Sequence, residues 1–391
     1  MRNVIGKPVT GDNFFGRDRE VEQLARMAEH EHILLLAPRR VGKTSLLLGV
    51  QGALPAGGPV TAVYVSVGDV RSELDFVRAV IEAAARTPAG TSLRPGPLRR
   101  WLRRRGRQVK RIGVGPSTIE LESNRAGWQE QADHAIDDLL AIDTVWLLMI
   151  DELPNMVLAL TEQDASGSRT WAFLHWFRAV RQRPAGLDKL RFVLAGSVGL
   201  DSVTRRQRIS AAINDLRSWQ LGPYDAPTAD AFLCELASAY AIDLTPEVRA
   251  HVRAHADWLI PYHLQVIFNV LREEVGSRRA TVGDVDAAVE RLLEQRQYFA
   301  TWDERLTATV GRPHDDHARA MLTACALDAD GASMTTIRRV LAEHVADATG
   351  REEARSWLLD VLVSDGYLVA DGERWRFRSS LLRRYWRRYF T

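Results

Sequence analysis

The sequence has few cysteines. Only Cys234 and Cys325 occur among its 391 residues, and they lie far apart. From this number we expect neither a disulfide framework nor a zinc site, and it suits a reducing compartment. Long apolar runs are missing as well, since none approaches the roughly 18 residues that cross a bilayer. Residues 1–16 contain no apolar signal core. We therefore expect a cytoplasmic protein without a membrane partner.

Lysine is also scarce. Lys7, Lys43, Lys110 and Lys189 are the only lysines, so every other basic side chain is an arginine or a histidine. An arginine cluster therefore carries less information here than in an average protein. The formal net charge of +2 favours no class of partner. The length predicts two or three domains.

A glycine-containing loop lies between a predicted strand, His32–Leu36, and an apolar helix start. The loop matches G-x-x-x-x-G-K-[ST] at every position except the first, where Ala37 replaces glycine. In this motif, backbone N–H groups of the loop and helix start cradle phosphate oxygens. We expect phosphate contacts from eight consecutive residues, which are Pro38, Arg39, Arg40, Val41, Gly42, Lys43, Thr44 and Ser45.

Three positions of this loop have distinct expected roles. Gly42 allows close backbone approach, Lys43 reaches the β- and γ-phosphates, and the Thr44 hydroxyl coordinates magnesium. The predicted ligands are ATP, or GTP, with Mg²⁺. Ala37 adds a methyl group at the loop entry and would be strained if its φ had to be positive. An alternative is a degenerate ATPase that serves as a scaffold, and Ala37 is the only residue that supports this hypothesis.

A second apolar strand ends in two carboxylates. Val145–Ile150 is followed directly by Asp151 and Glu152. Asp151 is expected to hold magnesium, and Glu152 to act as general base on the attacking water. The presence of Glu152 predicts an ATPase rather than a protein that only binds nucleotide. The alternative is a pair of solvated acids at a strand end.

A third predicted strand, Arg191–Ala195, leads to Ser197. Ser197 is our candidate for a third catalytic residue, which would sense the γ-phosphate, and a plain turn is the alternative. Arg205, Arg206 and Arg208 follow. One of them is a candidate arginine finger toward a neighbouring subunit, if the chain forms a homo-oligomer.

These motifs together resemble the archaeal-type ATPases, which are close to the STAND NTPases of the AAA+-like (ASCE) group. The resemblance implies the sheet order 5-1-4-3-2, a helical lid and a C-terminal winged helix. It also implies that Gly16 and Arg17 lie across the base and ribose, and that Pro261 belongs to a lid contact. The segments that carry it are FGRDRE at 15–20, APRRVGKTSLL at 37–47, LLMIDELPNM at 147–156, FVLAGSVGL at 192–200 and PYHLQ at 261–265.

Strands alternate with helices through residue 222, which predicts an α/β fold with a parallel sheet and helices on both faces. We expect a nucleotide-binding domain over 1–222, with an insertion over 87–128, then a helical lid over 223–297 and a winged helix-turn-helix over 298–391. The other predicted strands are Ala62–Val67 and Trp219–Leu221, with a hairpin of Tyr367–Val369 and Trp375–Phe377. The predicted helices beyond residue 222 are Asp230–Tyr240, Pro246–Ala256, Pro261–Glu274, Ala318–Leu327, Met334–Ala342 and Glu352–Asp365.

Two basic segments are candidates for binding DNA or an acidic protein partner. Arg99–Arg111 begins the insertion, and Arg383–Arg388 mixes arginines with aromatic residues near the C-terminus. The first is more typical of a solvated amphipathic helix in so arginine-rich a chain, and the second is equally typical of an amphipathic tail that packs on the body of the protein. Two functions follow. One is an ATPase that acts as a switch or remodeller through its winged helix. The other is a nucleotide-controlled DNA-binding protein like the origin-binding or transposition ATPases.

Overall fold

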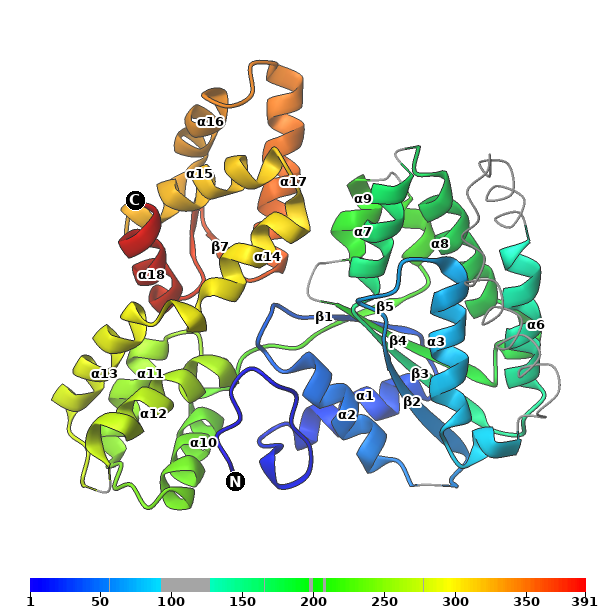
Figure 1. The fold of residues 1–391 in the computed structure, drawn as a ribbon, viewed down its shortest axis with the longest axis horizontal. Helices are drawn as coiled ribbons and strands as arrows, with labels where there is room; N and C mark the ends of the chain where they lie inside the picture. Colours follow the sequence, from blue (N-terminus) through cyan, green and yellow to red (C-terminus); the bar gives the residue numbers. More distant parts are fainter. Residues whose placement is uncertain (56, 93–126, 165, 197–199, 207–208, 277) are drawn as a thin grey trace, which may run out of the picture.

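The fold is described from a computed structural model, which covers all residues except 56, 93–126, 165, 197–199, 207–208 and 277 (Figure 1). A five-stranded parallel sheet has the order β2-β3-β4-β1-β5. This is the order 5-1-4-3-2 implied by the resemblance, so the predicted fold class is confirmed. The strands are β1 Ile33–Leu36, β2 Val60–Ser66, β3 Val145–Asp151, β4 Leu190–Gly196 and β5 Arg217–Gln220.

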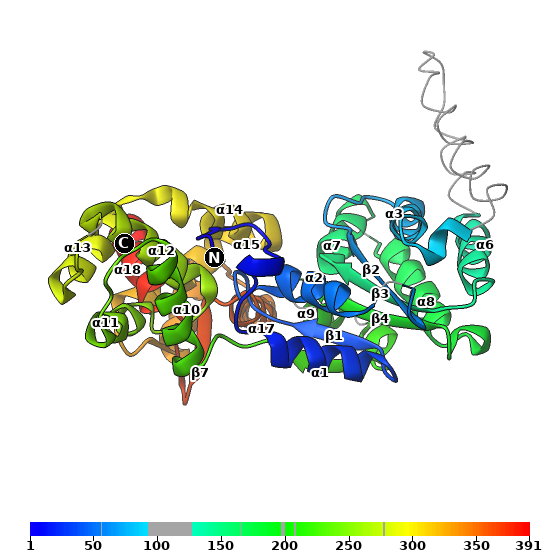
Figure 2. The ribbon, with the colours of Figure 1, turned by 90° about the horizontal axis from the view of Figure 1, so that it is seen from below.

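Helices cover both faces of the sheet because successive strand residues point to opposite sides. In β3, Leu147 and Met149 join the core on one face, while Trp146 and Leu148 join the core on the other. Figure 2 shows α1 and α2 on the opposite side of the sheet from α3, α7 and α8. The helices are α1 Asp18–Ala28, α2 Lys43–Ala53, α3 Glu73–Ala85, α6 Trp128–Leu140, α7 Leu153–Gln163, α8 Ser168–Arg181 and α9 Leu200–Arg206.

The predicted insertion falls largely outside the described residues. Its basic run Arg99–Arg111 lies there, and so does the segment 112–122, whose sequence predicts a hairpin with Gly115-Pro116 at its turn. Only the edges of the insertion are described, including the short 3₁₀ helix η2 (Ala89–Ser92).

Four helices follow the sheet. They are α10 Ala226–Ala239, α11 Pro246–Ala256, α12 Pro261–Val275 and α13 Val282–Glu294. Helix α10 begins four residues before the predicted Asp230. The reason is an N-cap that the apolar pattern did not reveal: the Asp225 carboxylate accepts a 2.8 Å hydrogen bond from the backbone N–H of Thr228.

The C-terminal unit combines helices with a small antiparallel sheet of order β6-β8-β7, consistent with the predicted winged helix. Its first helix, α14 (Ala300–Val310), was not predicted. Helices α15 and α17 begin four residues before the predicted Ala318 and Glu352. The elements are α15 His314–Leu327, β6 Ala332–Ser333, α16 Met334–Ala342, α17 Ala348–Ser364, β7 Leu368–Asp371, β8 Arg374–Phe377 and α18 Ser380–Phe390.

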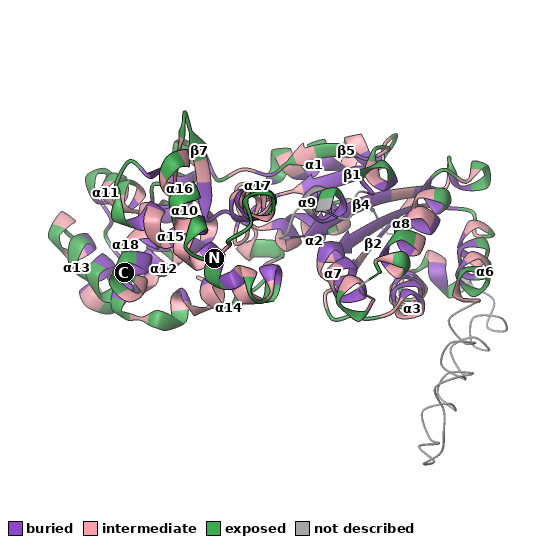
Figure 3. Ribbon diagram, turned by 90° about the horizontal axis from the view of Figure 1, so that it is seen from above, coloured by how far each residue is buried: buried purple, intermediate pink, exposed green. Residues whose placement is uncertain are grey.

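The sheet forms one lobe, and the helices after it pack with the C-terminal unit into a second lobe (Figure 1). The N-terminal segment, with its 3₁₀ helix η1 (Gly11–Asn13), runs between them. Buried residues concentrate on the strands and on the inner faces of the helices (Figure 3). Among the described residues, no helix has the length and apolar character needed to span a membrane.

Candidate functional site

The predicted phosphate-binding loop connects β1 to α2. Gly42 caps α2 with a φ of 106°, a backbone conformation that favours glycine. Arg40 also has a positive φ, of 65°. Ala37 does not, since the non-glycine residues with positive φ in the described chain are Arg40, Glu152, Ala241 and Asp257. Ala37 instead packs into the core beneath the loop, so its methyl group causes no backbone strain.

Lys43 is buried at the start of α2. Its ammonium group donates hydrogen bonds to the carbonyl oxygens of Ala37 (2.8 Å) and Pro38 (3.2 Å). Burial lowers the pKa of Lys43, while the nearby carboxylates of Glu152 and Asp151 oppose that shift. The ammonium therefore lies at the loop, within the electrostatic reach of both acidic residues.

Thr44 and Asp151 meet at the end of β3. The Thr44 hydroxyl donates a 2.7 Å hydrogen bond to Asp151 Oδ2, although the two residues are 107 positions apart. Asp151 is only 2% exposed, and its Oδ2 also accepts a 3.3 Å hydrogen bond from the Tyr64 hydroxyl. Burial and Asp151 raise the pKa of Tyr64, which keeps it a donor. A hydroxyl and a carboxylate converging in this way are the oxygen donors that Mg²⁺ prefers, so the residues fit the ion.

Glu152 lies at the N-terminus of α7 in a left-handed conformation, with a φ of 62°. Its carboxylate accepts a 2.5 Å hydrogen bond from the side-chain amide of Asn155 and a 3.3 Å hydrogen bond from Arg305. Arg305 belongs to α14, far along the chain. Neither partner was predicted. The E-x-x-N spacing of Glu152 and Asn155 places both side chains at the start of one helix and could have suggested Asn155, but nothing local points to Arg305.

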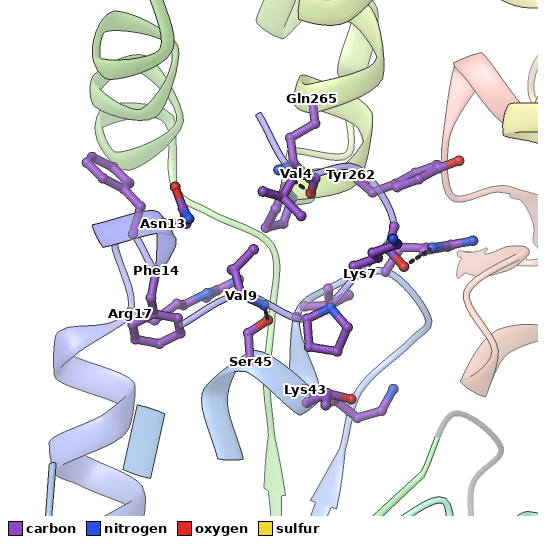
Figure 4. A pocket seen from close by; sticks show the side chains of 18 of the residues that line it. Val4, Lys7, Val9, Asn13, Phe14, Arg17, Lys43, Ser45, Tyr262 and Gln265 are labelled. Carbon is purple, nitrogen blue, oxygen red and sulfur yellow. Dashed lines mark hydrogen bonds between the residues drawn. The ribbon is translucent and has the colours of Figure 1, made fainter. Parts of the chain in front are cut away.

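A cavity of about 410 Å³ lies beside the loop, in the usual size range for small-ligand sites (Figure 4). The N-terminal segment forms one of its walls. The backbone N–H of Val9 donates to Ser45 Oγ (3.0 Å), and the Gln265 amide donates to the carbonyl of Val4 (3.0 Å). Most of the predicted phosphate contacts line this cavity, and so do Arg17, Glu152 and Pro261.

Two predicted base-and-ribose residues lie next to each other at the base of α10. Arg17 is buried; it pairs with Glu20 at 2.6 Å and stacks over the ring of Tyr224 at 4.6 Å. Gly16 does not line the cavity. Its φ is 65°, and a Cβ there would come within 2.5 Å of Thr228. Gly16 therefore allows the N-terminal segment to approach α10, while Arg17 faces the cavity.

The C-terminal unit touches the phosphate-binding loop directly. Arg39 donates a 3.2 Å hydrogen bond to the carbonyl of Thr301, and Arg40 donates a 3.1 Å hydrogen bond to its hydroxyl. Arg40 also donates to the carbonyl of Gly6 (3.2 Å) and lies 4.5 Å from the ring centre of Tyr262. One arginine of the loop therefore holds the N-terminal segment, α12 and α14 together.

A buried carboxylate from the C-terminal unit lies near the same loop. Asp365 follows α17 and is 1% exposed, and neither of its oxygens has a hydrogen-bond partner among the described residues. Burial raises the pKa of Asp365 to about 6, against the opposing effects of Arg39, Lys43 and Arg305. The next residue, Gly366, packs so closely that a Cβ there would lie 2.7 Å from Pro38. The turn after α17 thus sits on the loop.

The remaining predicted residues contribute less to this site. Ser197 lies outside the described residues, as do the side chain of Arg206 and the whole of Arg208. Arg205 pairs with Asp360 of α17 within the chain. Helix α18 packs on α11, α13 and α15, and Arg384 and Arg388 pair with Glu290 of α13. The basic C-terminal segment is therefore docked on the body of the protein.

The chain matches no protein-family model, and no curated protein is similar to it in sequence. Solved structures do match. The Walker-type ATPase PABY2304 of Pyrococcus abyssi is 17% identical and superimposes with a TM-score of 0.64, covering 98% of this chain and 99% of that one. The Aeropyrum pernix ORC2 protein, solved as ADPNP–ADP complexes, is 14% identical with a TM-score of 0.55, covering 97% and 95%. The chain therefore has the fold of a Walker-type P-loop ATPase, followed by a helical region and a C-terminal unit consistent with a winged helix.

Proposed function

We propose that the chain binds ATP with Mg²⁺, hydrolyses it, and acts as a nucleotide-dependent switch whose output is the position of its C-terminal unit. The contacts of α14 and of the turn after α17 with the phosphate-binding loop carry this proposal. Residues that would meet the phosphates are already bonded to the C-terminal unit, as Arg39 is to Thr301. A change of nucleotide state must therefore act on those contacts.

The binding roles follow from the positions of the side chains. Residues 38–45 would hold the phosphates through their N–H groups, with the ammonium of Lys43 at the β- and γ-phosphates. Thr44 and Asp151 would hold Mg²⁺, which would neutralise phosphate charge when bound. Arg17 and Pro261 would line the part of the cavity that holds the base and the ribose. Gly16 would help to place Arg17 there, because it lets the N-terminal segment approach α10 closely.

Hydrolysis would begin with a water molecule attacking the γ-phosphorus while the bond to the β–γ bridging oxygen breaks. Glu152 would accept the proton that the water loses, and ADP and phosphate would leave. Ser197 remains a predicted sensor of the γ-phosphate. The Glu152 carboxylate that would accept this proton is held by Arg305 of α14. Release of that pair is therefore the step that would couple catalysis to movement of α14.

Asp365 supplies a second element of the switch. Its carboxylate lies near the positive charges of Arg39, Lys43 and Arg305, and it has no hydrogen bond among the described residues. A triphosphate would compete for the same cations, and it would repel the carboxylate. The docked arrangement is thus expected to weaken when the phosphates bind.

Comparing ATP turnover of the unchanged chain with that of Glu152→Gln tests the proposal. The variant keeps the size of the side chain but cannot accept the proton, so turnover should fall about 100-fold or more while ATP still binds. Glu22→Gln, at an exposed position of α1, is the matched control. A chain that binds ATP but never turns it over, or a Glu152→Gln variant with full activity, would contradict the assignment.

The nucleotide-controlled DNA-binding function remains the second candidate. Its support now depends mainly on Arg99–Arg111, because Arg384 and Arg388 of α18 pair with Glu290 inside the chain. Filter binding with duplex DNA at two salt concentrations distinguishes the two functions. Affinity that falls steeply with salt and disappears when these arginines are replaced would favour DNA.

A further inference from the structure

A second group of potential metal ligands lies away from the phosphate-binding loop, where α11 packs on α13. His251 and His255 are four residues apart on α11, so they project from the same face one turn apart. Asp286 of α13 faces them. The candidate ligand atoms of the three side chains all lie within 4.8 Å of one another.

The three side chains converge on one point. Both imidazoles bring Nε2 to the same oxygen of Asp286, His251 at 2.8 Å and His255 at 2.7 Å. Their two Nε2 atoms are 3.3 Å apart. Without a cation, both nitrogens must carry a proton and donate to a single oxygen. A cation that replaces those protons would let two nitrogen lone pairs and one negative oxygen point at it.

We propose that His251, His255 and Asp286 form a binding site for a divalent transition-metal ion, with zinc as the best match. Two imidazole nitrogens and one carboxylate oxygen are a ligand set typical of zinc, whose fourth position is then taken by water. Tetrahedral bonds of about 2.0–2.1 Å place ligand atoms roughly 3.3–3.5 Å apart. The nitrogen pair already has this spacing, and Asp286, which is exposed, needs to move outward by only about half an ångström.

The surroundings of the site connect it to the C-terminal helix. Arg384 of α18 lies 3.5 Å from Nδ1 of His255 and pairs with Glu290, one turn after Asp286 on α13. When Nε2 of His255 binds a metal, its Nδ1 carries the proton and can no longer accept a hydrogen bond from Arg384. Arg384 would then lose its contact with His255 and keep its ion pair with Glu290. The bound ion would cross-link α11 and α13 at the surface on which α18 docks.

The test uses the full chain, stripped with a chelator and then titrated with Zn²⁺ in excess Mg²⁺ by calorimetry. We expect one equivalent to bind with a dissociation constant of about 1 µM or lower, together with a higher melting temperature. Cobalt should give the visible absorption of a tetrahedral site without a thiolate charge-transfer band, which separates this site from one that uses the exposed Cys234.

Asp286→Asn and the double variant His251→Gln, His255→Gln should each weaken zinc binding at least about 10-fold. Asp286→Asn keeps a hydrogen-bond acceptor for the imidazoles, so it tests the site even if the double variant does not fold. His30→Ala, at an exposed position of the other lobe, is the matched control and should bind normally. Absence of one-equivalent binding, or an affinity that Asp286→Asn leaves unchanged, overturns the proposal.

Discussion

The guanidinium of Arg305 donates a hydrogen bond of 3.3 Å to the carboxylate of Glu152. The two residues belong to different lobes, one on α14 and the other at the end of β3. Glu152, which we propose activates the water molecule, is thus held by α14, which we propose moves in response to hydrolysis. Four predictions follow from this and from neighbouring contacts.

Replacing Arg305 by alanine should raise basal ATP turnover about threefold or more, because Glu152 is released and the docked arrangement is weakened. Steady-state phosphate release measures the effect. Arg339→Ala, at an exposed position of α16, serves as the control. A drop in turnover would instead mean that Arg305 assists the reaction.

Replacing Asp365 by asparagine should stabilise the fold at neutral pH by roughly 2 kcal/mol, because an ionised carboxylate no longer has to be buried without a hydrogen bond. The folded-state pKa of about 6 lies above the usual 3.8. The stability difference between variant and wild type should therefore be full above pH 6 and shrink as the pH falls toward 3.8. Urea unfolding across this range measures it, and an equal stability of both chains at pH 7 would refute the prediction.

Replacing Asp151 by asparagine should remove the part of ATP affinity that depends on magnesium, about 10-fold or more, since the buried carboxylate is one of two protein oxygens placed for the ion. Titrating a fluorescent ATP analogue with and without Mg²⁺ measures this. Asp69→Asn changes an exposed aspartate near the same sheet edge and should have no effect. If Mg²⁺ dependence survives in Asp151→Asn, the ion is held elsewhere.

Arg40 allows a matched pair of variants. Both Arg40→Ala and Arg40→Gly lose the contacts to Gly6, Tyr262 and Thr301, and both should expose the N-terminal segment to proteases. Only alanine keeps a Cβ at a φ of 65°. The glycine variant should therefore be more stable to unfolding by about 1 kcal/mol. An alanine variant of equal or greater stability would show that the loop relaxes to another conformation.

The sheet could be predicted because its strands are short apolar runs that end in chemically distinctive residues. Asp151 and Thr44 were expected near each other for that reason, and they are in contact. Helix α14 was missed because no side chain caps its start at Phe299. The start of α10 was predicted too late because its N-cap, Asp225, lies before the apolar pattern begins.

The contacts that link the lobes could not be predicted. Asp365 was expected only as the end of a helix, but the close approach of the next residue, Gly366, to Pro38 depends on how two units pack. Arg305 and Tyr64 likewise reach the site through contacts between distant parts of the chain. Spacing along a sequence says nothing about such contacts unless a known family pattern includes them.

The N-terminal wall of the cavity has a kinetic consequence. Two hydrogen bonds hold the first nine residues in place, from the backbone N–H of Val9 to Ser45 Oγ and from the Gln265 amide to the carbonyl of Val4. A bound molecule would lose this wall whenever the segment moves away from the loop. The residence time of a ligand should therefore shorten when these two bonds are removed, even if the contacts from the phosphate-binding loop are preserved.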